Sequence, residues 1–374
     1  MRSRVASLLL LLVGTLPARA AAPACAKLVG AETLIRPGAH IVVGEIHGNQ
    51  ETPAAAATLL CLAAQKGPAR LALEVPADQE PAFTKFLTSK GTDADRARLL
   101  GESFWKRTTQ DGRSSAAMLA LLESARRLRS EGRDVGLVLF DIVGNVADRD
   151  VAMADNLSRA MSQAPQATFI ALVGNLHARR TKGTFKQNFM VARLVETGVP
   201  ITALLATHAG GSSWACAPEC GPLALTTTTK SGPGVQLEPV EDRAYDGTIN
   251  LGAAHFSPPA AVELTESQRL RVTTLGAEVE ANAAYDKKEF RRCAKLFDDL
   301  ARRTKSSQAA YSAACCAALA SDRDRAFVLL TTALDLGFNF AAAFDEDADL
   351  AALRSDPRWA KLRARLATAP AAQP

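Results

Sequence analysis

The chain has 374 residues, of which 48% are hydrophobic and 22% are charged, and its formal net charge is +5. This length exceeds what a single hydrophobic core usually holds, so we expect two domains. The positive charge is dispersed, without a run of lysine and arginine or a basic and aromatic stripe. The sequence therefore argues against a nucleic-acid partner.

The N-terminus has the pattern of an export signal. Arg2 and Arg4 precede a short apolar run, and small residues up to Ala20 follow it, where a signal peptidase would cut. We expect cleavage after Ala20 and an exported mature chain, either periplasmic or secreted. No later stretch reaches the roughly 20 apolar residues of a membrane-spanning helix, so we expect no transmembrane segment in the mature chain. A lipid anchor on Cys25 is the alternative to simple cleavage.

Seven cysteines in an exported chain predict disulfides, because thiols can oxidise outside the cytoplasm. Cys216 and Cys220 bracket a short segment that a disulfide could close, and the sequence lacks the second such pair that a zinc site would need. Cys25 and Cys61 are the next candidate pair. At least one cysteine must stay unpaired, and the expected buried free thiols are Cys293, Cys315 and Cys316.

From residue 38 onward, short β-branched or aliphatic runs alternate with longer helix-like stretches. This pattern indicates βαβ units, and so an α/β domain in which helices flank a largely parallel β-sheet. A stretch rich in Thr, Gly and Pro over residues 212–254 predicts loops, with room for a hairpin. The predicted strands span residues 41–43, 71–73, 135–140, 169–173 and 201–205.

Three helices are predicted between these strands. The first covers residues 54–64, with Thr52 as its N-cap and Pro53 at its first position. The second covers residues 115–130. The third covers residues 148–162 and begins with Asp148 as the capping residue.

The chain changes character after the Ser-Pro-Pro segment that ends at Pro259, and it looks helical from Thr265 almost to its end. We place the domain boundary near residue 262. Ala301 and Ala333 recur at a spacing close to the roughly 34-residue tetratricopeptide period, so the tail is predicted to be an all-α helical-repeat domain. Packing on the first domain and binding of a protein partner are both open roles for it. The predicted division is a signal peptide over 1–20, an α/β domain over 21–262 and a tetratricopeptide-like domain over 263–374.

Each predicted strand ends, at its carboxyl side, in polar residues of the kind that take part in catalysis. Because the carboxyl ends of strands in an open α/β sheet border the ligand cleft, we expect these residues to converge on one site. In chain order, the strand ends carry Glu45 and His47, then Glu74, Asp141, Asn175 and His177, and finally His208.

Two of the strand ends share a four-residue pattern. Gly-Glu-Ile-His ends at His47, and Gly-Asn-Leu-His ends at His177. Residues two apart on an extended chain point to the same side, so Glu45 and His47 can face one ligand. Gly44 and Gly174 carry no side chain and let the backbone turn or a substrate approach.

These motifs resemble those of the erythromycin-esterase/ChaN-like superfamily, which is similar in turn to the Tiki/TraB proteins. The resemblance covers residues 30–255 and includes the segments 110–114 and 149–156. What it implies for function divides three ways. Erythromycin-esterase relatives hydrolyse an ester with a histidine that activates water, Tiki relatives are metal-dependent proteases built around two Gly-x-x-His motifs, and ChaN relatives bind haem.

The resemblance implies that His47 is the general base, that Glu45 and Glu74 orient it, and that His177 is the second imidazole. A histidine near its normal pKa can accept a proton from water, and a flanking carboxylate fixes its tautomer. The same four residues would be the ligands if a divalent metal is bound. The residues expected to contact the substrate are Arg113, Asp141, Asn175 and His208.

Three functions stay open. The first is a hydrolase of an ester, lactone or peptide, with or without a divalent metal. The second is a haem- or tetrapyrrole-binding protein, although residues 48–52 supply no Asp-and-His run and aromatic residues are only 5% of the chain. The third is a catalytically silent domain whose tail recruits a protein partner. The sequence has no Gly-x-Ser-x-Gly elbow, so no serine nucleophile is expected. For each named residue, a structural role in a cap, an ion pair or the core is the alternative.

Overall fold

The computed structural model describes residues 24–143, 148–182, 188–216, 219–229 and 232–368. The predicted signal peptide, residues 1–20, lies outside these residues. None of the helices within them is long and apolar enough to cross a membrane.

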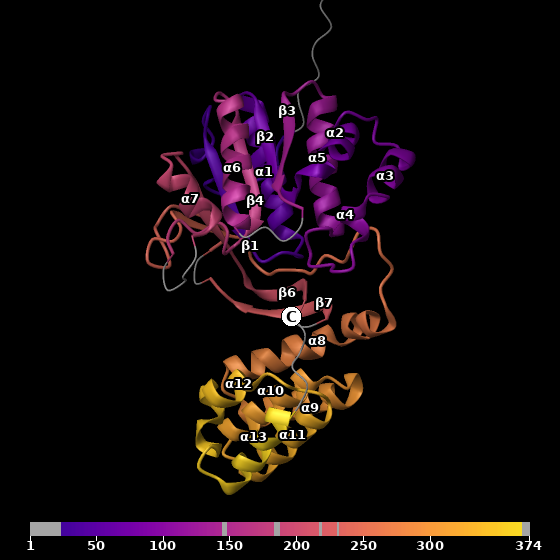
Figure 1. Ribbon diagram of the computed structural model, residues 1–374, viewed down its shortest axis with the longest axis vertical. Coiled ribbons are helices and arrows are strands. Elements are labelled where there is room, and N and C mark those ends of the chain that lie inside the picture. The colour runs from indigo at the N-terminus through magenta and orange to yellow at the C-terminus, as the bar shows by residue number, and fades with distance from the viewer. Residues whose placement is uncertain (1–23, 144–147, 183–187, 217–218, 230–231, 369–374) are drawn as a thin grey trace, which may run out of the picture.

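A seven-stranded sheet lies at the centre of the first part of the chain, with the strand order β3-β2-β4-β1-β5-β9-β8 (Figure 1). All neighbouring strands are parallel except β8, which is antiparallel to β9. The five predicted strands are confirmed, and so is the largely parallel α/β class. The strands are β1 His40–Glu45, β2 Ala69–Pro76, β3 Val135–Asp141, β4 Thr168–Gly174, β5 Thr202–Thr207, β8 Gly234–Gln236 and β9 Gly247–Asn250.

Helices cover both faces of this sheet, which explains why the central strands are buried on both sides. Ile41 and Val43 pack into the core beneath α1 (Glu51–Lys66) and α5 (Ala116–Ser130), whereas Val42 packs beneath α6 (Arg149–Gln163) and α7 (Met190–Glu196). This alternation is the two-residue period of a strand. Three short helices lie beside α5: α2 (Glu80–Leu87), α3 (Asp93–Leu100) and α4 (Ser103–Lys106).

The predicted N-caps of the helices are confirmed only in part. Asp148 caps α6, because its side chain accepts a hydrogen bond from the Val151 amide. The predicted cap at Thr52 is wrong, since α1 already begins at Glu51. The Asn49 side-chain oxygen accepts from the Thr52 amide at 2.8 Å, so Asn49 satisfies this amide and the helix starts earlier.

A two-stranded hairpin of β6 (Ala209–Cys216) and β7 (Cys220–Thr227) is held against the loop that follows β1. The Ser213 hydroxyl donates to the His47 carbonyl at 2.7 Å, and the Trp214 amide donates to the Gly48 carbonyl at 2.8 Å. Gly48 has a φ of 79°, and a Cβ there would lie 2.0 Å from the Trp214 carbonyl oxygen. Only glycine fits this position, so the hairpin and Gly48 together fix the loop that carries His47.

The last third of the chain is helical, as predicted. Its hydrophobic cluster draws only on residues 277–366 and shares no residue with the clusters around the sheet. The helical part lies beyond the hairpin in Figure 1, where the Gln268 side chain donates to the Cys220 carbonyl at 2.9 Å. The tetratricopeptide-like pattern itself stays a prediction. The helices are α8 Glu266–Asp286, α9 Phe290–Thr304, α10 Ser307–Leu319, α11 Arg323–Asp335, α12 Ala341–Glu346 and α13 Pro357–Thr368.

The domain boundary near residue 262 also stays a prediction. Because the hydrophobic clusters are separate, we expect residues 21–262 and 263–374 to give two folded pieces when expressed alone. Circular dichroism and thermal unfolding of each piece test this. An insoluble first piece would show that the helical part is needed to complete its core.

The cysteine pairing is only partly as predicted. Disulfides join Cys25 to Cys61 and Cys216 to Cys220, which confirms both predicted pairs. The prediction of three free thiols in the helical part is wrong, because Cys293 on α9 and Cys316 on α10 form a third disulfide. These helices pack side by side, with the two Cα atoms 5.8 Å apart, within the usual range for a disulfide. The free cysteine of the described residues is Cys315, which is buried.

The Cys25–Cys61 disulfide also bears on the anchor. A sulfur bonded to Cys61 is not available for a lipid, so the structure does not favour the lipid-anchor alternative at Cys25. Three disulfides are consistent with the predicted export, because such bonds persist in oxidising compartments.

Candidate functional site

The predicted charged residues at the ends of β1 to β4 meet at one edge of the sheet. Glu45 comes from β1, His47 from the loop after it, Glu74 from β2, Asp141 from β3 and His177 from the turn after β4. The strands β1 and β2 are not neighbours, because β4 lies between them. The residue at the end of β4 is Gly174, which pairs with Glu45 of β1. Since Gly174 has no side chain, His47 and Glu74 can contact each other across it.

His47 lies between two buried carboxylates. Its Nδ1 is 3.0 Å from Glu45 Oε1 and its Nε2 is 3.4 Å from Glu74 Oε2, while 21% of its side chain is exposed. Burial disfavours the charged imidazolium, but the Glu74 charge and the hydrogen bonds to both carboxylates outweigh burial and raise the pKa of His47 to about 10. His47 therefore carries a proton at neutral pH. Burial also raises the pKa of Glu45, although the contact with His47 offsets part of this effect.

Glu74 is the centre of the network. Its Oε1 accepts hydrogen bonds from Arg113 Nη1 at 2.9 Å and from Arg149 Nη2 at 2.6 Å. Its Oε2 accepts from the Gly174 amide at 2.8 Å. Burial alone would raise the pKa of Glu74, but His47 and Arg113 outweigh burial and hold this pKa well below its usual value. Glu74 is therefore a permanent carboxylate that holds three other residues in place.

Arg149 connects the two halves of the site, and the sequence analysis did not assign it a role. Its Nε and Nη2 donate to the two oxygens of Asp141, each at 2.8 Å, in a bidentate pair. Its Nη1 is 3.1 Å from His177 Nε2. Arg113 donates to Asp141 at 3.0 Å and to Asp111 at 2.8 Å, so both guanidinium groups are held by carboxylates.

His177 is oriented by Asp150, which is the second residue that the sequence analysis missed. His177 Nδ1 lies 2.6 Å from Asp150 Oδ1, and the same oxygen accepts from the Met190 amide at 2.7 Å. Arginine has donors only, so the contact with Arg149 requires His177 Nε2 to accept. By this assignment the proton of the neutral ring is on Nδ1 and points to Asp150, leaving the Nε2 lone pair free of a proton.

Both imidazoles border the space above Gly174. A Cβ added to Gly174 would lie 3.1 Å from His47 Nε2, 3.5 Å from His177 Cδ2 and 3.6 Å from Glu74 Oε2. A methyl group at this point would crowd His47 Nε2 and contact the His177 ring and the central carboxylate. The two histidines of the two sequence motifs therefore lie close to one point above Gly174.

Filling this space is expected to disturb the site without removing a polar group. In Gly174→Ala, the new methyl would push His47 away from Glu74, and we expect a loss of activity of about 10²-fold, the scale of a 1 Å misplacement. Overpacking should also lower the free energy of unfolding by about 1–3 kcal/mol. Kinetic assays beside urea unfolding measure both.

Gly276→Ala is the matched control, because a Cβ there would have no neighbour within 4 Å and the residue lies in the exposed helix α8. This change should leave activity unaltered and favour the helix. Full activity of Gly174→Ala would show that the space above Gly174 takes no part in catalysis.

Two predicted substrate-binding residues lie outside the network. The Asn175 side-chain oxygen accepts from the Leu176 amide at 3.0 Å, so it stabilises the turn that carries His177. His208 is buried, and neither of its ring nitrogens has a hydrogen-bond partner among the described residues. Burial lowers the pKa of His208. Arg113 and Asp141, in contrast, lie within the network.

The sequence contains a feature from which the roles of Arg149 and Asp150 could have been predicted. Arg149 and Asp150 are the first two residues of α6, directly after its cap Asp148. Side chains in the first turn of a helix that follows a strand can reach back to the carboxyl edge of the sheet, which is where both are found. An Arg-Asp pair directly after a predicted cap was therefore a recognisable feature of segment 149–156.

The four predicted metal ligands do not fit a divalent cation as they are arranged. Arg149 donates to both Glu74 and His177, so a guanidinium already occupies the position that faces two of the donors. His47 presents its two nitrogens to different carboxylates. A cation at this point would have to displace these contacts.

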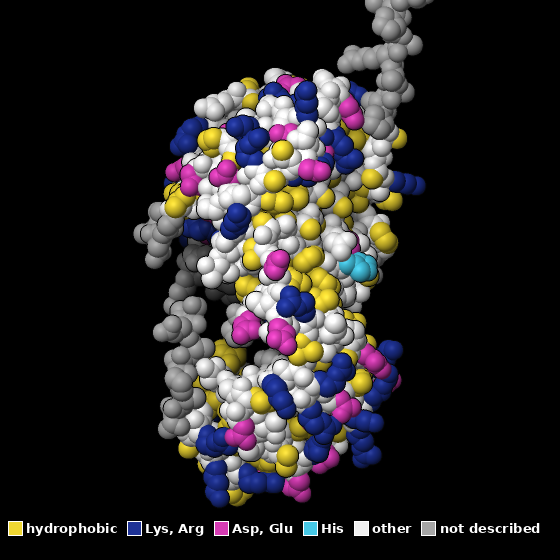
Figure 2. Space-filling view, turned by 90° about the vertical axis from the view of Figure 1, so that its right-hand side faces the viewer, with side chains coloured by type: hydrophobic (Ala, Val, Ile, Leu, Met, Phe, Trp, Pro, Cys, Tyr) yellow, Lys and Arg dark blue, Asp and Glu magenta, His cyan; other side chains and the backbone are white. Residues whose placement is uncertain are grey.

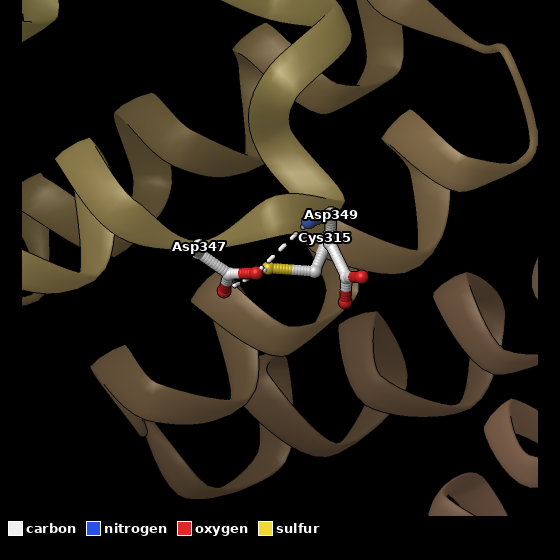
Figure 3. Close-up of side chains that lie close together, drawn as sticks. All are labelled: Cys315, Asp347 and Asp349. Carbon is white, nitrogen blue, oxygen red and sulfur yellow. Dashed lines mark hydrogen bonds between the residues drawn. The ribbon is translucent and has the colours of Figure 1, made fainter.

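One other cluster of potential ligands is found among the residues that the structure describes. Cys315, Asp347 and Asp349 of the helical part each offer an atom within 4.8 Å of the others (Figure 3). Tyr311 donates to Asp347 Oδ2 at 2.8 Å, and Tyr285 donates to Asp349 Oδ2 at 2.8 Å. The cluster therefore has a structural explanation. Its two carboxylates accept hydrogen bonds that connect α8 and α10 to the segment after α12.

The raised pKa of His47 predicts how stability depends on pH. The charged form is favoured in the folded state, so this contribution is complete below the unfolded pKa of 6.5 and is lost as pH rises through about 10. We expect the free energy of unfolding to fall between these values in the wild type and to fall less in His47→Gln. Urea unfolding across this pH range measures the difference. If the free energy of unfolding changed with pH in the same way in both proteins, the raised pKa of His47 would be contradicted.

Comparison with known proteins gives a limited answer. No protein-family model matches the sequence, and no curated protein has a significantly similar sequence. A crystal structure of a Bacillus cereus protein is 11% identical, covers 61% of this chain and 91% of that one, and has a TM-score of 0.46. An erythromycin esterase mutant in its open conformation is 13% identical, with coverages of 60% and 88% and a TM-score of 0.43. A succinoglycan biosynthesis protein is 10% identical, with coverages of 59% and 89% and a TM-score of 0.40. These similarities are low, so the family stays a prediction from the sequence motifs.

Proposed function

We propose that this chain is a hydrolase of a carbonyl substrate, an ester, lactone or peptide, and that two histidines carry out its acid-base chemistry. The observation that carries the proposal is a pair of imidazole–carboxylate contacts, His47 with Glu45 and His177 with Asp150, which border the same space above Gly174. Hydrolysis requires a base that takes a proton from water and an acid that gives a proton to the leaving group, both close to one bound substrate.

His177 is the better base of the two. Its Nδ1 proton is directed to Asp150, so its Nε2 is the nitrogen that can accept a proton, and Asp150 stabilises the imidazolium that forms. In the reaction, a water molecule transfers a proton to His177 Nε2 while its oxygen attacks the carbonyl carbon. Arg149 Nη1, which now contacts Nε2, has to give way to this water.

His47 is the better acid, which revises the sequence-based assignment of this residue as the base. With a pKa of about 10, it carries its proton at neutral pH, and once its Nε2 turns away from Glu74 it can donate that proton to the leaving oxygen or nitrogen. When the carbonyl–leaving-group bond breaks, His47 has lost a proton and His177 has gained one. Transfer of a proton from His177 to His47 through solvent restores both.

The charges around the two histidines support this assignment. Negative charge develops on the carbonyl oxygen in the transition state, and Arg149 is the more exposed of the two guanidinium groups that could stabilise it. Glu45 Oε2 is buried and has no hydrogen-bond partner among the described residues. It is therefore an open acceptor for a hydrogen bond from the substrate or the attacking water.

The proposal is tested with purified protein and a panel of esters, lactones and peptides, assayed with and without a chelator. We expect turnover of at least one class that the chelator does not reduce. Chelator-sensitive turnover with bound metal by elemental analysis would contradict the metal-free mechanism. No turnover, together with a Soret band on adding haemin, would favour the haem-binding alternative instead.

We further propose that the protein acts outside the cytoplasm, supported by its three disulfides, and that the helical part either braces the hydrolase or binds a protein partner. Fractionation of cells that express the full chain tests the first point. A mature protein that stays in the cytoplasm would contradict it.

A further inference from the structure

The β6–β7 hairpin lies between the α/β part and α8 (Figure 1). A two-stranded hairpin leaves one edge of each strand without a sheet partner, so the backbone groups there need other partners. The free edge of β6 bonds to the loop after β1, where the Trp214 amide donates to the Gly48 carbonyl at 2.8 Å. Beside it, the Ser213 hydroxyl donates to the His47 carbonyl at 2.7 Å. The hairpin therefore contacts the backbone of the proposed acid.

Trp214 also contacts the loop that carries Arg113. Its side chain is fully buried, and its indole Nε1 donates to the Gln110 carbonyl at 2.8 Å. A Cβ on Gly112 would lie 2.5 Å from the Gly48 amide nitrogen and 2.8 Å from the Trp214 carbonyl oxygen. This loop and the loop after β1 thus meet at one residue of β6, and a shift of the strand would move both.

The other edge of the hairpin bonds to α8 of the helical part. Arg271 donates from Nη1 to the Glu219 carbonyl and from Nη2 to the Pro222 carbonyl, each at 3.2 Å. The Gln268 side chain donates to the Cys220 carbonyl at 2.9 Å. Helix α8 thus supplies the donors for three carbonyls at one end of the hairpin, and Arg271 serves two of them.

The two sets of contacts lie on opposite sides of one cross-strand pair. Trp214, which bonds to the Gly48 carbonyl, is paired with Pro222, which bonds to Arg271. The hydrophobic clusters of the two parts share no residue, and the parts join at a narrow waist in the space-filling view (Figure 2). The most extensive contact between them is that of α8 with β7. A displacement of α8 is therefore passed to the hairpin.

We propose that Arg271 is a positioning residue of the hydrolase. It holds β7, and the hairpin in turn holds the loop that places His47 between Glu45 and Glu74. The inference rests on the proposed function and makes the helical part a brace for the site. Accurate placement matters because a 1 Å displacement of a catalytic group can cost about 10²-fold in rate. The hydrogen bonds of Arg271 go to the hairpin, so it acts on His47 through this element.

Arg271→Met tests the proposal in the full mature chain, because it removes the donors and keeps an apolar side chain. We expect kcat to fall by about tenfold and KM to change little, since a displaced acid slows the chemical step rather than binding. Arg269→Met is the matched control. Arg269 is exposed on the same helix and bonds to the Leu264 carbonyl, so its loss should leave kcat unchanged. Equal rates in Arg271→Met and the wild type would overturn the proposal.

Hydrogen exchange measured by NMR reports the contact between the hairpin and the loop without any substrate. The Trp214 amide and indole should exchange about tenfold faster in Arg271→Met, whereas the amide of Val43 in the buried strand β1 keeps its rate. Arg269→Met should match the wild type. Faster exchange in a chain without turnover would contradict the hydrolase and support the brace. Unchanged exchange at Trp214, or equal acceleration at Val43, would overturn the brace whether or not a substrate is found.

The route through the hairpin is tested with Ser213→Ala, which removes the hydroxyl that bonds to the His47 carbonyl. We expect this variant to lose at least as much turnover as Arg271→Met. In the double variant the loss should be smaller than the product of the two single losses, because Arg271 acts through a contact that Ser213→Ala has already weakened. Losses that multiply would show independent effects and would overturn the route.

Discussion

Replacing Glu74 with glutamine is expected to lower the free energy of unfolding by about 3 kcal/mol, the cost of removing one partner from a buried ion network. The reason is that Glu74 neutralises His47, Arg113 and Arg149 together and is only 5% exposed. A glutamine of the same shape leaves these three cations with one fewer buried negative charge. Urea unfolding at neutral pH measures the change.

Glu280→Gln is the matched control for this substitution. Glu280 pairs with Arg292 in the helical part, where both side chains are more than half exposed and an ion pair contributes little to stability. We therefore expect a much smaller loss of stability at Glu280 than at Glu74. Equal losses at both positions would show that the network at the sheet edge has no special role in the fold.

The second large effect is expected on turnover. His177→Gln removes the proposed base and should reduce hydrolysis by about 10²–10⁴-fold, the usual contribution of general acid-base catalysis. His177 is partly exposed and its ring fills no core position, so the melting temperature should change little. The comparison of initial rates with thermal unfolding separates the two effects.

His255→Gln is the matched control, because it removes an imidazole that lies outside the site. His255 pairs with a carboxylate, Glu51, as His177 does with Asp150, but it is exposed and lies outside the site. Its loss should leave turnover unchanged. A variant of His177 that keeps its activity, or one that loses activity only because it unfolds, would remove His177 from the mechanism.

The strand-end residues could be predicted from sequence because the position of each depends only on the strand that directly precedes it in the chain. Glu45, His47 and Glu74 directly follow buried strands, and parallel strands place such positions at one edge. The partner of His47 could not be predicted in the same way. The strand order places β4 between β1 and β2, so the contact with Glu74 exists only because Gly174 lacks a side chain.

The residues that the sequence did not reveal depend on packing between distant segments. Arg149 and Asp150 matter because α6 returns to the sheet edge, and Cys293 meets Cys316 because α9 packs beside α10. The protonation of His47 is a further example. A sequence motif identifies the imidazole, whereas its pKa depends on the burial and charge of groups that the fold brings to it.

The central claim is that His47 and His177 act as acid and base in one reaction, and the double variant His47→Gln/His177→Gln tests it most directly. Residues that act as a unit are not additive, so the double variant should lose about as much turnover as the worse single variant. Rates are compared on one substrate, with melting temperatures to confirm the fold. Losses that multiply in the double variant would show two independent contributions and would contradict the account.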